Sequence, residues 1–164
     1  MLGLSLSAFT ILHVIISLIA IVAGFVVMFG MLGSKAMPGL TAIFLLFTIL
    51  TSVTGFMFPF EVLLPSHILA ILSLVLLAIA CIALYAMKLA GAWRPIYVVT
   101  ALGSLYLNVF VLVTQVFLKT PALHELAPGN PPNGPAFAVA QGVVLVFFVV
   151  MIVAVWRRFK PISA

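Results

Sequence analysis

The chain has 164 residues, of which 66% are hydrophobic and only 5% charged, and its mean hydropathy is +1.48. A soluble domain carries charge on about a quarter of its residues, so this composition excludes a soluble globular enzyme, a disordered chain and a nucleic-acid-binding domain. Cys81 is the only cysteine, which excludes a disulfide scaffold.

The few charged residues divide the sequence into five long uncharged runs. Each run is long enough for a transmembrane helix, which needs about 20 apolar residues. Prolines lie only at the ends of these runs or between them, where a lost backbone hydrogen bond is tolerated. We therefore predict an all-α integral membrane bundle forming one domain over residues 1–164. The predicted spans are 8–32, 38–59, 65–87, 95–118 and 136–157.

The basic residues indicate how the bundle is oriented. If the N-terminus is outside, six of the seven Lys and Arg residues lie in cytoplasmic loops, and only Lys119 lies outside, together with Glu61 and Glu125. The positive-inside rule then predicts an N-out, C-in topology. Basic residues scattered among spans form no basic face, so nucleic acid is not an expected partner.

The long connection, 119–135, separates the last two spans. Its Thr120-Pro121 pair is typical of a helix start, because Thr can cap the helix and Pro fixes the first φ angle. The following ALHELA segment predicts a short interfacial helix in this outer loop, and the Pro- and Gly-rich remainder predicts a stiff irregular connector.

The sequence contains no motif of a known catalytic site. Glycine-rich phosphate loops, H-E-x-x-H, CxxC and nucleophile-elbow patterns are absent, and Asp does not occur. Both Glu residues fall near the outer surface, which argues against an acidic relay through the membrane centre. A non-enzymatic protein is therefore the favoured interpretation.

Strong hydrogen-bonding side chains fall at similar depths in the outer half of four predicted helices. At a rise of 1.5 Å per residue, His13 lies about 8 Å below the outer end of its helix, and Asn108 lies near the midplane. The candidate ligand-binding residues are His13, His67, Asn108, Gln115 and Gln141, and the candidate rim residues are Glu61, His124 and Glu125. We expect Gln115 or Gln141 to be the partner of His13, with the short outer helix covering the pocket.

Most hydroxyl and amide side chains inside a membrane are hydrogen-bond partners between helices. We interpret Ser17, Thr48, Ser52 and Ser104 in this way, and their spacing with small residues predicts faces that point inward. His13 is deeper and ionisable, so both structural hydrogen bonding and ligand binding stay open for it.

The function expected from these features is a polar pocket in the outer leaflet that binds a small amphipathic ligand, or an accessory subunit of a larger membrane complex. An alternative is a membrane redox protein. It would hold a b-type haem between His13 and His67, a metal ion on these residues with His124 and a Glu, or a quinone. A small transporter is the third interpretation, although uninterrupted helices argue against it. The expected partners are the lipid bilayer and another membrane protein or a second copy.

Three stretches resemble a group of uncharacterised small multi-pass bacterial inner-membrane proteins. They are LTSVTGFMFPF at 50–60, LLPSHILAILSLV at 63–75 and WRPIYVVTALGSLYLNVFVLVTQVFLKTPALHELAP at 93–128. The resemblance implies a location in the bacterial inner membrane and about five helices. It supplies no activity, cofactor or site residue.

Overall fold

The computed structural model describes residues 2–59, 62 and 65–161, and helices are the regular secondary structure of this described part. Five helical segments are long and apolar enough to cross a membrane, which confirms the predicted number of spans. They are α1 (Leu6–Leu32), α2 (Pro38–Phe56), α3 with its extension η1 (Pro65–Cys81 and Ile82–Ala86), α4 (Trp93–Lys119) and α6 (Pro135–Arg158).

Local sequence explains where these helices begin. Proline occupies the first turn of α2 and α6, where its missing N–H breaks no helical hydrogen bond. Ser5 caps α1, because its side-chain oxygen accepts a hydrogen bond from the Ala8 amide at 3.3 Å. The third span, predicted as one regular helix, ends in the π-helical segment η1.

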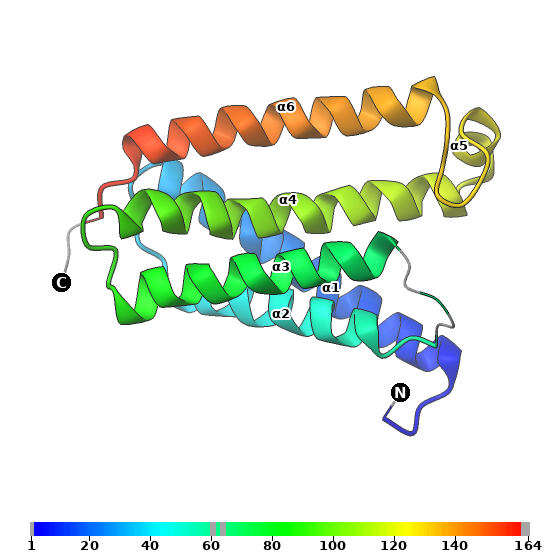
Figure 1. Cartoon of the computed structure of the whole chain (residues 1–164), viewed down its shortest axis with the longest axis horizontal. Coiled ribbons are helices and arrows are strands. Elements are labelled where there is room, and N and C mark those ends of the chain that lie inside the picture. Colours follow the sequence, from blue (N-terminus) through cyan, green and yellow to red (C-terminus); the bar gives the residue numbers. More distant parts are fainter. Residues whose placement is uncertain (1, 60–61, 63–64, 162–164) are drawn as a thin grey trace.

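Helix α4 is the centre of the bundle (Figure 1). It contacts α1, α2, α3 and α6, and it is the most buried of the five spans. The other helices expose large apolar side chains on their outer faces, as Val22 and Val139 do on α1 and α6. A polar surface is not needed there, because lipid rather than water surrounds a membrane span.

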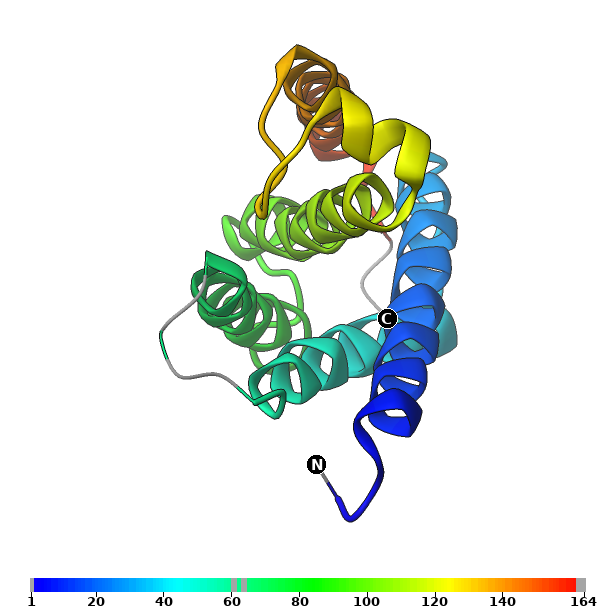
Figure 2. The same ribbon diagram turned by 90° about the vertical axis from the view of Figure 1, so that its right-hand side faces the viewer.

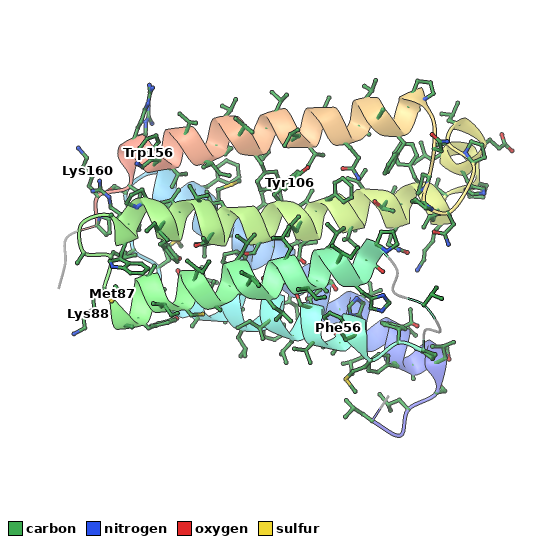
Figure 3. The ribbon with its side chains drawn as sticks, in the orientation of Figure 1. Phe56, Met87, Lys88, Tyr106, Trp156 and Lys160 are labelled. Atoms are coloured by element: carbon green, nitrogen blue, oxygen red, sulfur yellow. The ribbon has the colours of Figure 1, made fainter. Side chains whose placement is uncertain are left out.

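The two ends of the bundle differ in charge. We call the end at which α1 begins the N-terminal end, and the end at which α6 finishes the C-terminal end. Figure 3 shows Lys88, Trp156 and Lys160 at the C-terminal end. Basic residues at the ends of membrane spans, together with an interfacial tryptophan, are typical of a membrane–water boundary.

Gly24 lets helix α1 pack closely against α2 and α4. A Cβ atom at Gly24 would lie 2.6 Å from Leu105 Cδ1 and 2.9 Å from Phe44 Cε1, so only glycine fits there without displacement. From this point α1 diverges from α4 toward the N-terminal end (Figure 2). The divergence leaves space between α1, α2, α3 and α4 in that half of the bundle.

The short helix predicted in the long connection is present as α5 (Pro121–Leu126). It contacts α4 and α6, and Figure 2 shows it beside these two helices rather than over the space between α1 and α4. The expectation that it covers the pocket is therefore wrong. Helix α5 packs instead against the ends of α4 and α6.

Candidate functional site

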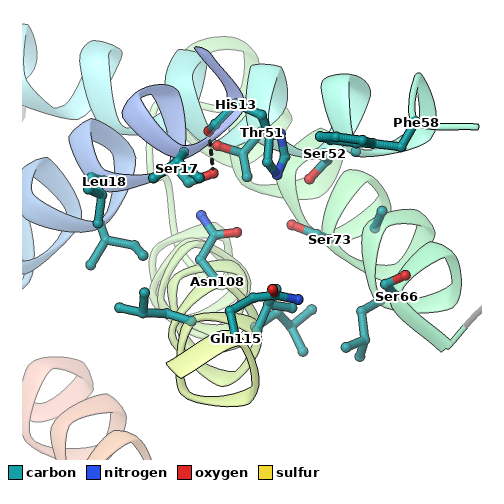
Figure 4. Close-up of a pocket in the computed structure, with 18 of the residues that line it drawn as sticks. His13, Ser17, Leu18, Thr51, Ser52, Phe58, Ser66, Ser73, Asn108 and Gln115 are labelled. Carbon is teal, nitrogen blue, oxygen red and sulfur yellow. Dashed lines mark hydrogen bonds between the residues drawn. The ribbon is translucent and has the colours of Figure 1, made fainter. Parts of the chain in front are cut away.

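A cavity of about 590 Å³ lies between α1, α2, α3 and α4, in the half of the bundle nearest the N-terminal end. This volume falls within the range of about 300–1,000 Å³ that is common for small-molecule sites. Apolar atoms form most of the wall surface, and polar side chains from all four helices project among them (Figure 4). The polar lining residues are Thr10, His13, Ser17, Thr51, Ser52, Ser66, His67, Ser73, Asn108, Gln115, Lys119 and Thr120.

The structure brings together four of the five candidate ligand-binding residues. His13 reaches the cavity from α1, His67 from α3, and Asn108 and Gln115 from α4. Gln141 lies elsewhere: its side-chain Nε2 donates to the Phe110 carbonyl at 3.0 Å, between α6 and α4. Its predicted place in the pocket is wrong, because α6 packs on a face of α4 away from the cavity.

The candidate rim residues do not gather at the cavity in the described structure. Glu61 lies outside the described residues. His124 and Glu125 are exposed on α5 and are not among the lining residues. Within the described ranges, no group of three or more His, Cys, Asp or Glu side chains is placed to hold a metal ion. The predicted set of His13, His67 and His124 is therefore not brought together.

His13 is held by Thr54, which was not in the predicted set. The distance between His13 Nδ1 and Thr54 Oγ1 is 2.6 Å, and Thr54 Oγ1 also lies 2.7 Å from the Leu50 carbonyl oxygen. A carbonyl can only accept, so the single hydroxyl hydrogen of Thr54 points to Leu50. His13 must then donate from Nδ1, and in the neutral imidazole Nε2 is left as an acceptor or metal ligand.

A simple sequence signal identifies Thr54 in retrospect. Helices α1 and α2 are antiparallel and joined by a short connection, so residues equally far from that connection lie side by side. His13 lies 32 − 13 = 19 residues before the end of α1, and Thr54 lies 54 − 38 = 16 residues after the start of α2, so the two residues are within about one helical turn of being level. Depth in the membrane alone does not say which helix provides the partner of His13. The Phe58 ring packs edge-on against His13, with ring centres 5.2 Å apart, and fixes the imidazole from the other side.

Two polar groups that line the cavity have no hydrogen-bond partner. Asn108 Nδ2 and Ser73 Oγ are buried and unpaired, and they are two of four such atoms among the described residues. Figure 4 shows Asn108 and Ser73 directed into the space from α4 and α3. Leaving a buried polar group unpaired costs about 1–3 kcal/mol. A bound molecule with polar atoms at this position would remove that cost.

Several other hydroxyls in or near the cavity behave differently. Ser17, Thr48 and Ser104 each donate at 2.7 Å to a carbonyl in the preceding turn of their own helix. They were predicted to bond between helices, but a serine or threonine in a helix reaches its own backbone more easily. The unpaired state of Ser73 is therefore not a general property of the hydroxyls in this bundle.

Charge is confined to the rim of the cavity. Lys119 is exposed at the last turn of α4, and no described lining residue is acidic. We call Asn108 and Ser73 the floor of the cavity, because both lie deeper in the bundle than Gln115 and Lys119. The floor is polar but carries no formal charge.

Gly55 keeps the cavity open beside His13. It lines the cavity from α2, and a Cβ atom there would lie 3.9 Å from His13 Cε1, which is an ordinary contact distance. A methyl group would therefore fit, but a longer side chain at this position would extend into the cavity.

No family model matches this chain, and no curated protein or solved structure is similar enough to count as a match. We therefore infer function from the residues and geometry of the cavity.

Proposed function

We propose that this protein binds a small amphipathic ligand in the cavity between α1, α2, α3 and α4. The observation that carries the proposal is the pair of unpaired polar groups, Asn108 Nδ2 and Ser73 Oγ, in a cavity of about 590 Å³ whose wall surface is mainly apolar. A molecule with a polar head and an apolar body satisfies both parts of this lining. Binding rather than catalysis is proposed, in keeping with a sequence that carries no catalytic motif.

The proposed location is the bacterial inner membrane, with the N-terminus outside. The support is the charge distribution: the connections after α1 and α3, the first turn of α4 and the end of α6 together carry six of the seven basic residues. These segments share the C-terminal end of the bundle, which the positive-inside rule assigns to the cytoplasm. The cavity then belongs to the outer leaflet and faces the periplasm. Association with a larger membrane complex stays a prediction from the sequence.

A b-type haem is the second candidate, because His13 and His67 line the same cavity and His13 Nε2 has a free lone pair. The fit is weaker, since two haem propionates need basic partners and Lys119 is the one such residue in the described lining. A Soret band in the absorption spectrum of the purified protein would support haem, and a colourless protein would reject it.

Ligand binding is tested by extracting the detergent-purified protein and identifying the released small molecules by mass spectrometry. The wild type should release one compound near stoichiometry. Gly55→Leu should lose it, because the new side chain enters the cavity. Gly142→Leu is the matched control, since a Cβ atom at Gly142 on α6 meets nothing within 4 Å. Equal yields from both variants, or no compound from the wild type, would reject the proposal.

A further inference from the structure

We infer that the ligand enters the cavity sideways from the bilayer, between α1 and α4, and that its polar head is uncharged and lies at the floor. The inference rests on the proposed function and names the class of molecule and its route. The route follows from the gap between α1 and α4, and the class of molecule follows from the hydrogen-bonding groups at the floor.

The gap between α1 and α4 is a lateral opening. The helices meet at Gly24 and Leu105 and diverge toward the N-terminal end (Figure 2). On the two sides of the gap, Val14, Leu18 and Val116 line the cavity and are also 40%, 44% and 43% exposed. A side chain that is both cavity wall and outer surface lies at an opening. Apolar side chains line this opening, which faces lipid, so it suits a hydrocarbon chain.

The polar head must lie at the floor rather than at the rim. If an apolar chain pointed inward, Asn108 Nδ2 and Ser73 Oγ would stay unpaired with the ligand bound. With the head inward, both groups gain partners, and the chain leaves through the lateral opening.

The head is uncharged because the floor offers no counter-ion. Lys119 is the one Lys or Arg in the described lining, and it lies about 16 Å from Asn108 along α4, at 1.5 Å per residue. An ionised carboxylate at the floor would be buried without a cation, which is strongly unfavourable in the membrane interior.

The hydrogen-bonding groups define the head further. Asn108 Nδ2 donates, Ser73 Oγ can donate or accept, and His13 Nε2 accepts. The matching head carries carbonyl or hydroxyl oxygens on an apolar chain. Isoprenoid quinones and quinols share this chemistry with diacylglycerol, and binding experiments can tell these sources apart.

The first experiment measures binding of three probes to the full chain in lipid nanodiscs by native mass spectrometry. The probes are decylubiquinol, dioctanoylglycerol and decanoate. One of the two neutral probes should bind at least about tenfold more tightly than decanoate, and the tighter one identifies the source. Asn108→Leu should weaken that probe about tenfold, the equivalent of one lost hydrogen bond, and leave decanoate unchanged.

Ser73→Ala supplies a matched comparison. It should weaken the neutral probe, whereas Ser104→Ala should not, because Ser104 is buried, is bonded within its own helix and does not line the cavity. Equal effects of the two serine substitutions would contradict a head at the floor.

The second experiment tests the route. Nanodisc protein loaded with the deuterated neutral probe is chased with unlabelled probe, and release is followed over time. Leu18→Trp should slow release several-fold, because it narrows the lateral opening. Val143→Trp, at an exposed position on α6 away from the cavity, should not. Unchanged release in Leu18→Trp, or slower release only in Lys119→Trp at the rim, would overturn the lateral route.

The two proposals fail in different ways. If the wild type binds none of the probes and yields no extractable compound, the proposed function is wrong. If it binds decanoate as tightly as the neutral probes and Asn108→Leu has no effect, the proposed function stands and the neutral head is wrong.

Discussion

The contact between His13 and Thr54 sets the hydrogen-bonding pattern of the cavity. Thr54→Val keeps the shape of the side chain but removes the acceptor for the His13 Nδ1–H group. We expect a loss of about 1 kcal/mol in the free energy of unfolding, the typical value of one hydrogen bond. Denaturant unfolding of the detergent-solubilised protein measures this change.

Thr48→Val is the control for that substitution. Thr48 is buried on the same helix and bonds only to a carbonyl of its own helix, so its loss should cost less. If Thr54→Val and Thr48→Val were equally destabilising, the His13–Thr54 hydrogen bond would contribute nothing measurable.

The sequence predicted which residue types form the site better than it predicted their partners. Depth along a helix follows directly from residue number, and this placed His13, His67, Asn108 and Gln115 in the half of the bundle where they line one cavity. The direction in which a side chain points depends on how helices rotate and cross. In α4, the periodic spacing of small and polar residues indicated which face points inward. Helix α6 is almost uniformly apolar and offers no such signal, so the direction of Gln141 was predicted wrongly.

The packing of α1 against α2 and α4 depends on Gly24. Gly24→Leu should destabilise the bundle by at least about 1–3 kcal/mol, because the added side chain overlaps Leu105 and Phe44. Thermal unfolding in detergent, with Gly142→Leu as the control, measures the effect. A Gly24→Leu protein that expresses and unfolds like the wild type would mean that α1 does not approach α4 there.

A double-mutant cycle tests the same contact from both sides. Gly24→Ala creates an overlap with Leu105 Cδ1, and Leu105→Ala removes that atom and leaves a cavity. The double substitution should therefore be less destabilising than the sum of the two, by about 1 kcal/mol or more. Additive effects in the unfolding measurements would show that the two side chains do not meet.

The sequence was sufficient to predict the number of long helices, because charges and prolines separate the apolar runs. It did not foresee the π-helical turn at Ile82–Ala86, which no charge or proline signals. The short helix at Pro121–Leu126 was predicted from local residues. Its position beside α6 depends on the path of the connection, which local residues do not determine.

The orientation of the bundle in the membrane is a property of the whole molecule. Because six of seven basic residues lie at the C-terminal end, a reporter fused after residue 164 should be cytoplasmic, and one inserted in 128–135 should be periplasmic. Alkaline phosphatase and green fluorescent protein fusions report the two sides. Reporters on the same side would contradict a bundle of five spans.

We expect the cavity between α1, α2, α3 and α4 to hold a ligand whose head pairs with Asn108 and Ser73 at the floor. An experimentally determined structure of the wild-type protein in lipid nanodiscs tests it most directly. We predict non-protein density within hydrogen-bonding distance of Asn108 Nδ2 and Ser73 Oγ, continuing as a chain past Leu18 to the bilayer. A cavity without such density, with Asn108 and Ser73 paired to other protein groups, would contradict it.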